Sequence, residues 1–167
     1  MTAFYTETFE AADTALDVIE QCLTSSDWSS ERGEGSTLHC AAPTRWGECG
    51  GMFAWRDNPN AVHFTLSAEL RAPGVRQLEI VRLLSLVNER LWLGHFEYWS
   101  HEGVVMFRHT LPMLDRPGPE PGEIVALITA ATEAVDRFLP AFNFVVWAGK
   151  SAEDAVEASL FDTCGEA

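Results

Sequence analysis

The first candidates for chemistry in this chain are the histidines and glutamates between positions 95 and 109. His95 and Glu97 stand two residues apart in a strand-like segment, so their side chains share a face and could form an acid–base pair. His101 and Glu102 fall in a predicted turn, where solvation is the simplest interpretation. A cross-strand polar pair on a partly exposed face also explains His95 and Glu97, and it is the commoner outcome. We therefore predict no catalytic residue here.

A second candidate is Cys49, which lies in the glycine-rich run 47–51. A nucleophilic thiolate needs a nearby positive group to lower its pKa, and the local sequence offers Arg45 but also Glu48. The run has neither the Gly-Lys-Ser/Thr ending of a phosphate loop nor a helix after it. A tight turn between strands, with Cys49 as a small apolar residue, is the favoured interpretation.

A mixed metal site could be imagined from His39, Cys40, Cys49 and His63. Adjacent residues on a strand point to opposite faces, so His39 and Cys40 have the wrong spacing for paired ligands. The chain contains no CxxC pair among its four cysteines, which are Cys22, Cys40, Cys49 and Cys164. We predict no metal and no cofactor, and reduced cysteines.

Apolar residues at helical spacing predict the helices that surround these side chains. One helix runs from Thr8 to Leu23, a second follows Pro73 and a third begins near Ile124. The second stripe consists of Ile80, Leu84, Val87 and Leu91. Pro140 should interrupt the third helix, because proline lacks an N–H donor and clashes with the preceding turn. Beyond it, Gly149 should end a short helical segment and Ser151 should cap a last short helix.

Alternation of apolar and polar residues predicts five strands. They cover residues 37–42, 52–56, 62–68, 91–99 and 104–109, and the last two form a hairpin. The polar segment from Asp27 to Ser36 is either a loop or a short edge strand. The order α-β-β-β-α-β-β-α-α predicts an α+β fold in a single domain of residues 1–167, with an antiparallel sheet of about five strands packed with helices.

The hairpin is rich in aromatic residues on both faces. Trp92, Phe96 and Tyr98 share one face by alternation, while Leu93, His95, Glu97 and Trp99 share the other. A single domain cannot easily cover both faces, so we predict a homodimer. The candidate interaction surface consists of Trp92, Phe96, Tyr98, Phe142 and Trp147. Trp147 could instead belong to the core, which its apolar neighbours favour.

Charge and hydropathy exclude several classes of partner. The chain of 167 residues has a net charge of −14, with −7 in residues 1–34, zero in residues 35–114 and −7 in residues 115–167. Nucleic acids and anionic membranes bind clustered lysine and arginine, so neither is an expected partner. No apolar run approaches the ~20 residues that span a bilayer, and the first ten residues are acidic. We expect a cytoplasmic protein.

Several motifs resemble the YbjN family of bacterial proteins. They are VNERLWLGHF at 87–96, VMFRH at 105–109, RFLPAF at 137–142, VWAGKS at 146–151 and the ending CGEA. The resemblance covers most of residues 70–167. It implies a fold like that of type III secretion chaperones and a regulator of sensory transduction, with no catalytic residues to carry over.

Two classes of function remain open from the sequence. The first is a non-enzymatic regulator or chaperone-like adaptor that binds an unidentified protein partner through exposed apolar surface. The second is a small-molecule sensor, or a thiol- or metal-dependent enzyme that uses the histidines and cysteines. Convergence of those groups in one pocket would favour the second class, whereas scattered groups would favour an adaptor.

Overall fold

The computed structural model describes residues 2–164 of the chain, and side chains for residues 10–161. This part has an α+β fold with a six-stranded antiparallel sheet and four α-helices. In chain order the elements are α1 (Thr2–Ser25), β1 (Ser29–Arg32), β2 (Thr37–Thr44), β3 (Gly47–Arg56), β4 (Ala61–Arg71), the 3-10 turn η1 (Gly74–Arg76), α2 (Gln77–Asn88), β5 (His95–Trp99), β6 (Val104–Pro112), α3 (Pro121–Val146) and α4 (Ala152–Cys164).

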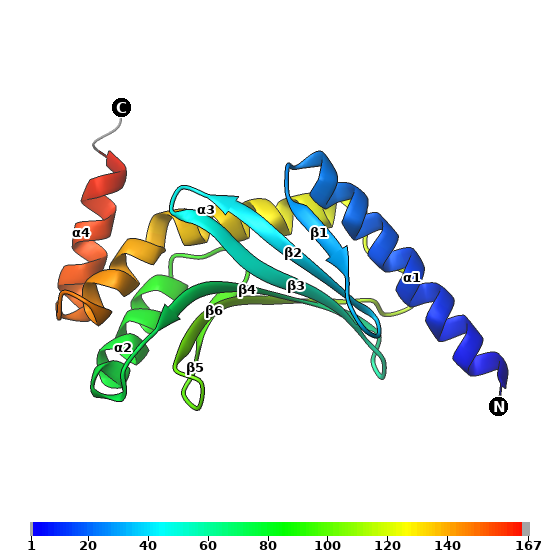
Figure 1. Ribbon diagram of the computed structural model, residues 1–167, viewed down its shortest axis with the longest axis horizontal. Helices are drawn as coiled ribbons and strands as arrows, with labels where there is room; N and C mark the ends of the chain where they lie inside the picture. Colours follow the sequence, from blue (N-terminus) through cyan, green and yellow to red (C-terminus); the bar gives the residue numbers. More distant parts are fainter. Residues whose placement is uncertain (1, 165–167) are drawn as a thin grey trace.

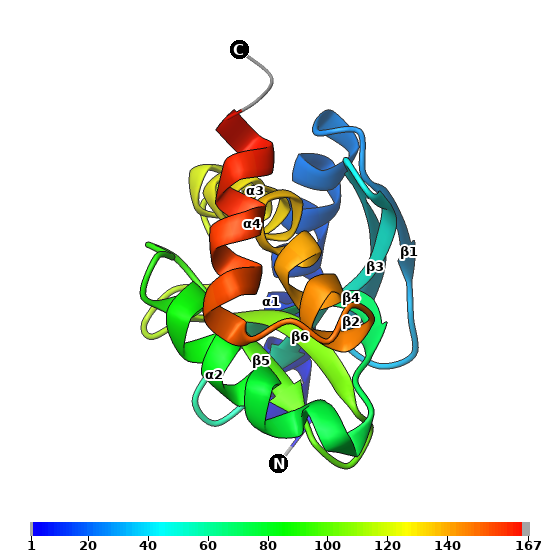
Figure 2. The ribbon, with the colours of Figure 1, turned by 90° about the vertical axis from the view of Figure 1, so that its left-hand side faces the viewer.

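The strands are arranged in the order β1-β2-β3-β4-β6-β5. Figure 1 shows α3 running along one face of the curved sheet, with α1 against the same face at the β1 end and α2 and α4 at the β5 end. Figure 2, seen from the α2 end, shows α4 beside α3, and α4 packs against both α3 and α2. No helix of the described residues covers the opposite side of the sheet, which we call the bare face.

A row of aromatic rings forms the core between the sheet and α3. The ring centroids of Phe53 and Phe64 are 4.4 Å apart, and Phe96 contacts both Phe107, at 5.6 Å, and Phe142 of α3, at 5.2 Å. All five rings are 2% exposed or less, so burial of aromatic surface is a large stabilising contribution. Strand alternation therefore turns one side of each strand into core and leaves the other side for the bare face.

Most predicted apolar stripes are confirmed. Leu38, Cys40 and Ala42 of β2 are buried, as is the alternating set of β4. The predicted inward residues of α3 are also buried, namely Ile124, Leu127, Ile128, Ala131, Val135 and Phe138. In α2 the buried residues are Ile80, Leu83 and Val87. Leu84 packs only partly and Leu91 lies beyond the helix, so that predicted stripe was partly wrong.

The predicted break at Pro140 is wrong, because α3 continues through it to Val146. Proline cannot donate a hydrogen bond to the carbonyl of Asp136, four residues earlier. That carbonyl instead accepts a hydrogen bond from Nε1 of Trp46 at 2.9 Å. The Asp136 side chain accepts a second one from the backbone N–H of Arg45 at 2.7 Å. The turn between β2 and β3 thus supplies the donor that the helix lacks.

The strand boundaries depart from the sequence prediction mainly at the starts of β3 and β5. The segment Ser29–Arg32 forms β1, which is the edge-strand alternative of the prediction, whereas β3 begins at Gly47 rather than Met52. Strand β5 begins only at His95, because Gly94 adopts a left-handed φ of +70° over the ring of Phe107. A side chain at position 94 would clash with that ring, so only glycine permits this approach.

The carboxy-terminal turn follows the predicted capping. Gly149 has a φ of +68°, which ends the segment after α3, and the Asp154 N–H donates to Oγ of Ser151 at 3.2 Å. Glu79 of α2 also accepts the Ala152 N–H at 2.9 Å. The hydrogen bond from Ala152 to Glu79 therefore attaches the start of α4 to α2. The side chains of Phe9 and Cys164 lie outside the described residues.

Candidate functional site on the bare face

The bare face is hollowed where β3, β4 and β6 lie side by side. The hollow has a volume of about 790 Å³, within the range typical of ligand sites. Its lining residues come from those strands, from the turn at residues 57–59 and from the end of β5. They are Met52, Ala54, Arg56, Asp57, Asn58, Pro59, Ala61, His63, Thr65, Trp99, Met106, Arg108, Thr110 and Pro112.

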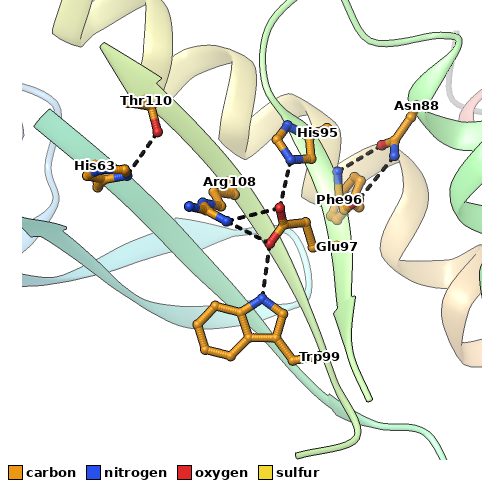
Figure 3. A network of polar contacts seen from close by, with 8 residues as sticks. All are labelled: His63, Asn88, His95, Phe96, Glu97, Trp99, Arg108 and Thr110. Carbon is orange, nitrogen blue, oxygen red and sulfur yellow. Dashed lines mark hydrogen bonds and ion pairs between the residues drawn. The ribbon is translucent and has the colours of Figure 1, made fainter. Parts of the chain in front are cut away.

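Glu97 is the centre of a polar network beside this hollow (Figure 3). Its carboxylate accepts hydrogen bonds from Nε1 of Trp99 at 3.0 Å and from Nη1 of Arg108 at 3.1 and 3.2 Å. Nε2 of His95 lies 3.0 Å from Oε1 of the same carboxylate. His95, Glu97 and Trp99 alternate along β5, and Arg108 faces His95 across the ladder, so strand geometry places all four together.

The predicted pairing of His95 with Glu97 is confirmed as a contact, within one strand rather than across two. Burial alone would raise the pKa of Glu97, but the hydrogen bonds from Trp99, His95 and Arg108 hold it below its usual range. The carboxylate is therefore ionised at neutral pH and its oxygens are already occupied. Such a group is a poor general base, and it serves instead to orient the Arg108 guanidinium and the Trp99 ring.

His63 lies on β4, on the other side of Arg108 from Glu97 (Figure 3). Its Nδ1 is 2.9 Å from Oγ1 of Thr110, its register partner on β6. Burial lowers the pKa of His63, and the positive charges of Arg108 and Arg56 lower it further. The imidazole is therefore neutral at pH 7. Burial also lowers the pKa of His109, with a further contribution from His95.

The structure does not bring the cysteines and histidines into one site. Cys40 and Cys49 are buried on the helix side of the sheet, whereas His39 is exposed and His63 belongs to the bare face. Burial raises the pKa of Cys40 to about 12 and also raises that of Cys49, so both thiols stay protonated. No group of three potential metal ligands occurs among the described residues.

The predicted interaction surface divides between core and solvent, and two of its members were wrong. Phe96 and Phe142 are buried and contact each other, because alternation on β5 turns Phe96 toward α3. Tyr98 is half-buried, and its hydroxyl donates to the carbonyl of Ala72 at 3.3 Å. Trp92 is 74% exposed in the loop before β5, off the predicted strand. Trp147, expected in the core, is 75% exposed after α3.

A second uncovered region lies on α2 and the turn before it. Val75, Leu78 and Val81 are all exposed, Leu78 by 80%. Their spacing of three residues places them on one side of the helix, opposite Ile80, Leu83 and Val87. We call these three residues the α2 face. The sequence analysis missed it, although the same helical periodicity that gave the inward stripe also marks a second, outward stripe.

Comparison with known proteins shows which family this chain belongs to. The family model of YbjN, described as "Putative bacterial sensory transduction regulator", matches residues 15–144. This chain belongs to the YbjN family. The crystal structure of YbjN from E. coli, described as a putative transcription regulator, is similar with a TM-score of 0.49 and 13% identity, covering 88% of this chain and 92% of that one. No curated protein matches significantly. Every helix of the described residues falls short of what crossing a bilayer requires.

Proposed function

We propose that this YbjN-family chain is a non-enzymatic cytoplasmic regulator that acts through protein–protein contacts, first with a second copy of itself and, as a homodimer, with another protein. The observation that carries the proposal is the α2 face. Three exposed apolar residues at a spacing of three, on α2 and the turn before it, have no partner in the described fold, and Leu78 is 80% exposed. Clustered apolar residues of this kind are typical of interaction sites.

Charge favours a second copy as the occupant of the α2 face. A chain with a net charge of −14 repels its copies over most of its surface. Residues 70–92 differ, because they contain four arginines and two glutamates and are therefore net positive. An interface built on this segment keeps the acidic surfaces of the two copies apart. A two-fold interface brings each copy's residues against the other's, so Arg82 of one copy can meet an acidic residue of its partner.

The absence of an enzymatic role is part of the same proposal. It is supported by the protonated, buried thiols of Cys40 and Cys49 and by the fully hydrogen-bonded carboxylate of Glu97. None of these groups is poised to attack a substrate or to take its proton. A likeness to type III secretion chaperones stays a prediction that fits the adaptor role.

Affinity capture from the native cytoplasm tests the regulatory part. Wild-type protein should retain a reproducible, stoichiometric protein partner that Leu78→Asp loses, because the charged side chain prevents dimerisation and the partner binds the homodimer. Leu114→Asp is the matched control, since Leu114 is also exposed but lies in the loop before α3. Equal capture by all three proteins, or no stoichiometric partner for wild type, would reject the α2 face as the contact surface.

A further inference from the structure

The hollow on the bare face has the features of a binding site that the proposed protein contacts do not use. From its geometry we infer that it binds a small monocarboxylic acid with a flat apolar body. The carboxylate would lie between Arg56 and Arg108, and the body against Met52, Met106 and Trp99. This inference does not rest on the α2 face, which is a different part of the molecule.

The register of the sheet brings the two arginines to the same histidine. His63 pairs with Ala54 on β3 and with Thr110 on β6. Arg56 lies two residues beyond Ala54, and Arg108 lies two residues before Thr110, so both share the side of the sheet that carries His63. Arg56 is opposite Ala61 and Arg108 is opposite Thr65, so the two arginines lie diagonally on either side of His63, on the two strands that flank β4.

Each of these groups keeps hydrogen-bonding capacity for a ligand. Among the described residues, Arg108 uses only Nη1, toward Glu97, so its Nε and Nη2 donors are available. Arg56 makes no ion pair with a described residue and is exposed at the rim of the hollow. His63 uses Nδ1 toward Thr110, which leaves Nε2. Guanidinium groups bind planar carboxylates through paired N–H donors.

The charge balance favours one negative charge over two. Glu97 already neutralises Arg108, and Asp57, which accepts a hydrogen bond from Trp55 Nε1 at 2.9 Å, lies next to Arg56. A phosphate dianion would bring two negative charges to a hollow that Asp57 already lines and whose Arg108 is already paired with Glu97, whereas a monocarboxylate brings one. Repulsion between like charges therefore selects against the dianion.

The walls of the hollow select an apolar body. Met52 and Met106 lie on the hollow from β3 and β6, and methionine adapts its shape to a ligand. Trp99 forms another wall, and its ring is held in place by the indole N–H bond to Glu97. A fixed indole beside flexible thioethers suits an aromatic ring, which can stack on the tryptophan while its carboxylate reaches the arginines.

Isothermal titration calorimetry with indole-3-acetate as the probe tests this site. Wild type should bind one equivalent saturably, and Arg56→Gln should weaken binding about tenfold or more, because the variant lacks one of the two guanidinium groups. The variant should stay folded, since Arg56 is exposed. Arg137→Gln on α3 is the control and should bind like wild type. Indole-3-acetamide should bind at least about tenfold more weakly than the acid, because it is uncharged. Inorganic phosphate should also bind at least about tenfold more weakly, because it carries more negative charge.

Four results would overturn the inference. They are the absence of saturable binding up to about 1 mM, equal affinity in Arg56→Gln and Arg137→Gln, equal affinity for the amide, and tighter binding of phosphate. Circular dichroism of each variant establishes that it is folded. A nuclear magnetic resonance titration locates the site independently, because the Trp99 indole N–H signal should shift on binding while that of the exposed Trp147 should not.

Discussion

The bare face and the α2 face are both uncovered, but they differ in how their side chains are held. On the bare face, Glu97 holds Trp99, His95 and Arg108 in a network of directional hydrogen bonds. On the α2 face, Val75, Leu78 and Val81 are exposed on α2 and the turn before it, and no side-chain hydrogen bond restrains them. Directional hydrogen bonds select a ligand by its geometry, whereas burial of apolar surface is favourable for any partner of complementary shape. The bare face and the α2 face therefore differ in what they can bind, although both are exposed.

The largest expected effect comes from removing the layer beneath the bare face. Phe96 points from β5 into the core while its neighbour Glu97 points outward. Phe96→Ala should lower the free energy of unfolding by about 3–5 kcal/mol, because it leaves a cavity among Phe107, Phe142 and the sheet. Urea denaturation measures this. A loss below about 1 kcal/mol would show that Phe96 is a surface residue after all.

The next effect concerns Gly94, which lies between α2 and β5 along the chain. Gly94 lies between the exposed loop of Trp92 and the start of β5. Gly94→Ala should destabilise the protein by about 2–4 kcal/mol, because its left-handed φ and its contact with the Phe107 ring both exclude a side chain. Thermal unfolding measures it. Gly50→Ala is the control, since open space surrounds that position and its stability should change little.

A smaller, pH-dependent effect sharpens the account of the network. Glu97→Gln should cost about 1–2 kcal/mol at pH 7, because a neutral amide makes weaker hydrogen bonds to Arg108 and Trp99. The pKa of Glu97 is lower in the folded protein than its usual value, so its stabilisation is present above about pH 4 and is lost as pH falls through the folded pKa. The free energies of unfolding of wild type and Glu97→Gln, measured by chemical denaturation, should therefore become equal at low pH. A constant difference between pH 7 and pH 3 would contradict the ionised network.

The smallest effect distinguishes exposed from buried aromatics. Trp147→Ala should change the stability by less than about 0.5 kcal/mol, because Trp147 is 75% exposed. The matched variant is Phe142→Ala, five residues earlier on α3, which should cost about 3–5 kcal/mol. Chemical denaturation of both variants checks the pair. Similar losses in the two proteins would return Trp147 to the core, where the sequence placed it.

Periodicity predicted most of the fold because burial is periodic in both helices and strands. It correctly assigned the inward residues of β2, β4 and α3. It failed at Pro140, since the compensating hydrogen bond comes from Trp46, some ninety residues away in sequence. It also failed at Trp92, because the glycine turn at Gly94 shortens the strand for a tertiary reason, the Phe107 ring.

The candidate site was only partly predictable. The His95–Glu97 pair followed from alternation, but Arg108 and Trp99 joined it through the register of β5 and β6, which a single sequence does not specify. The placement of Arg56 and Arg108 on either side of His63 likewise depends on β3 and β6 both pairing with β4. The α2 face was within reach of the sequence, since it needed only the outward side of a helix that was already predicted.

Sedimentation equilibrium of the wild-type chain and Leu78→Asp is the most direct test of the proposal that the α2 face is a protein contact surface. At micromolar concentration, wild type should have about twice the chain mass of 18.5 kDa, and Leu78→Asp should have the mass of one chain. Leu114→Asp should stay dimeric. A monomeric wild-type protein, or a dimer that persists in Leu78→Asp, would contradict the account.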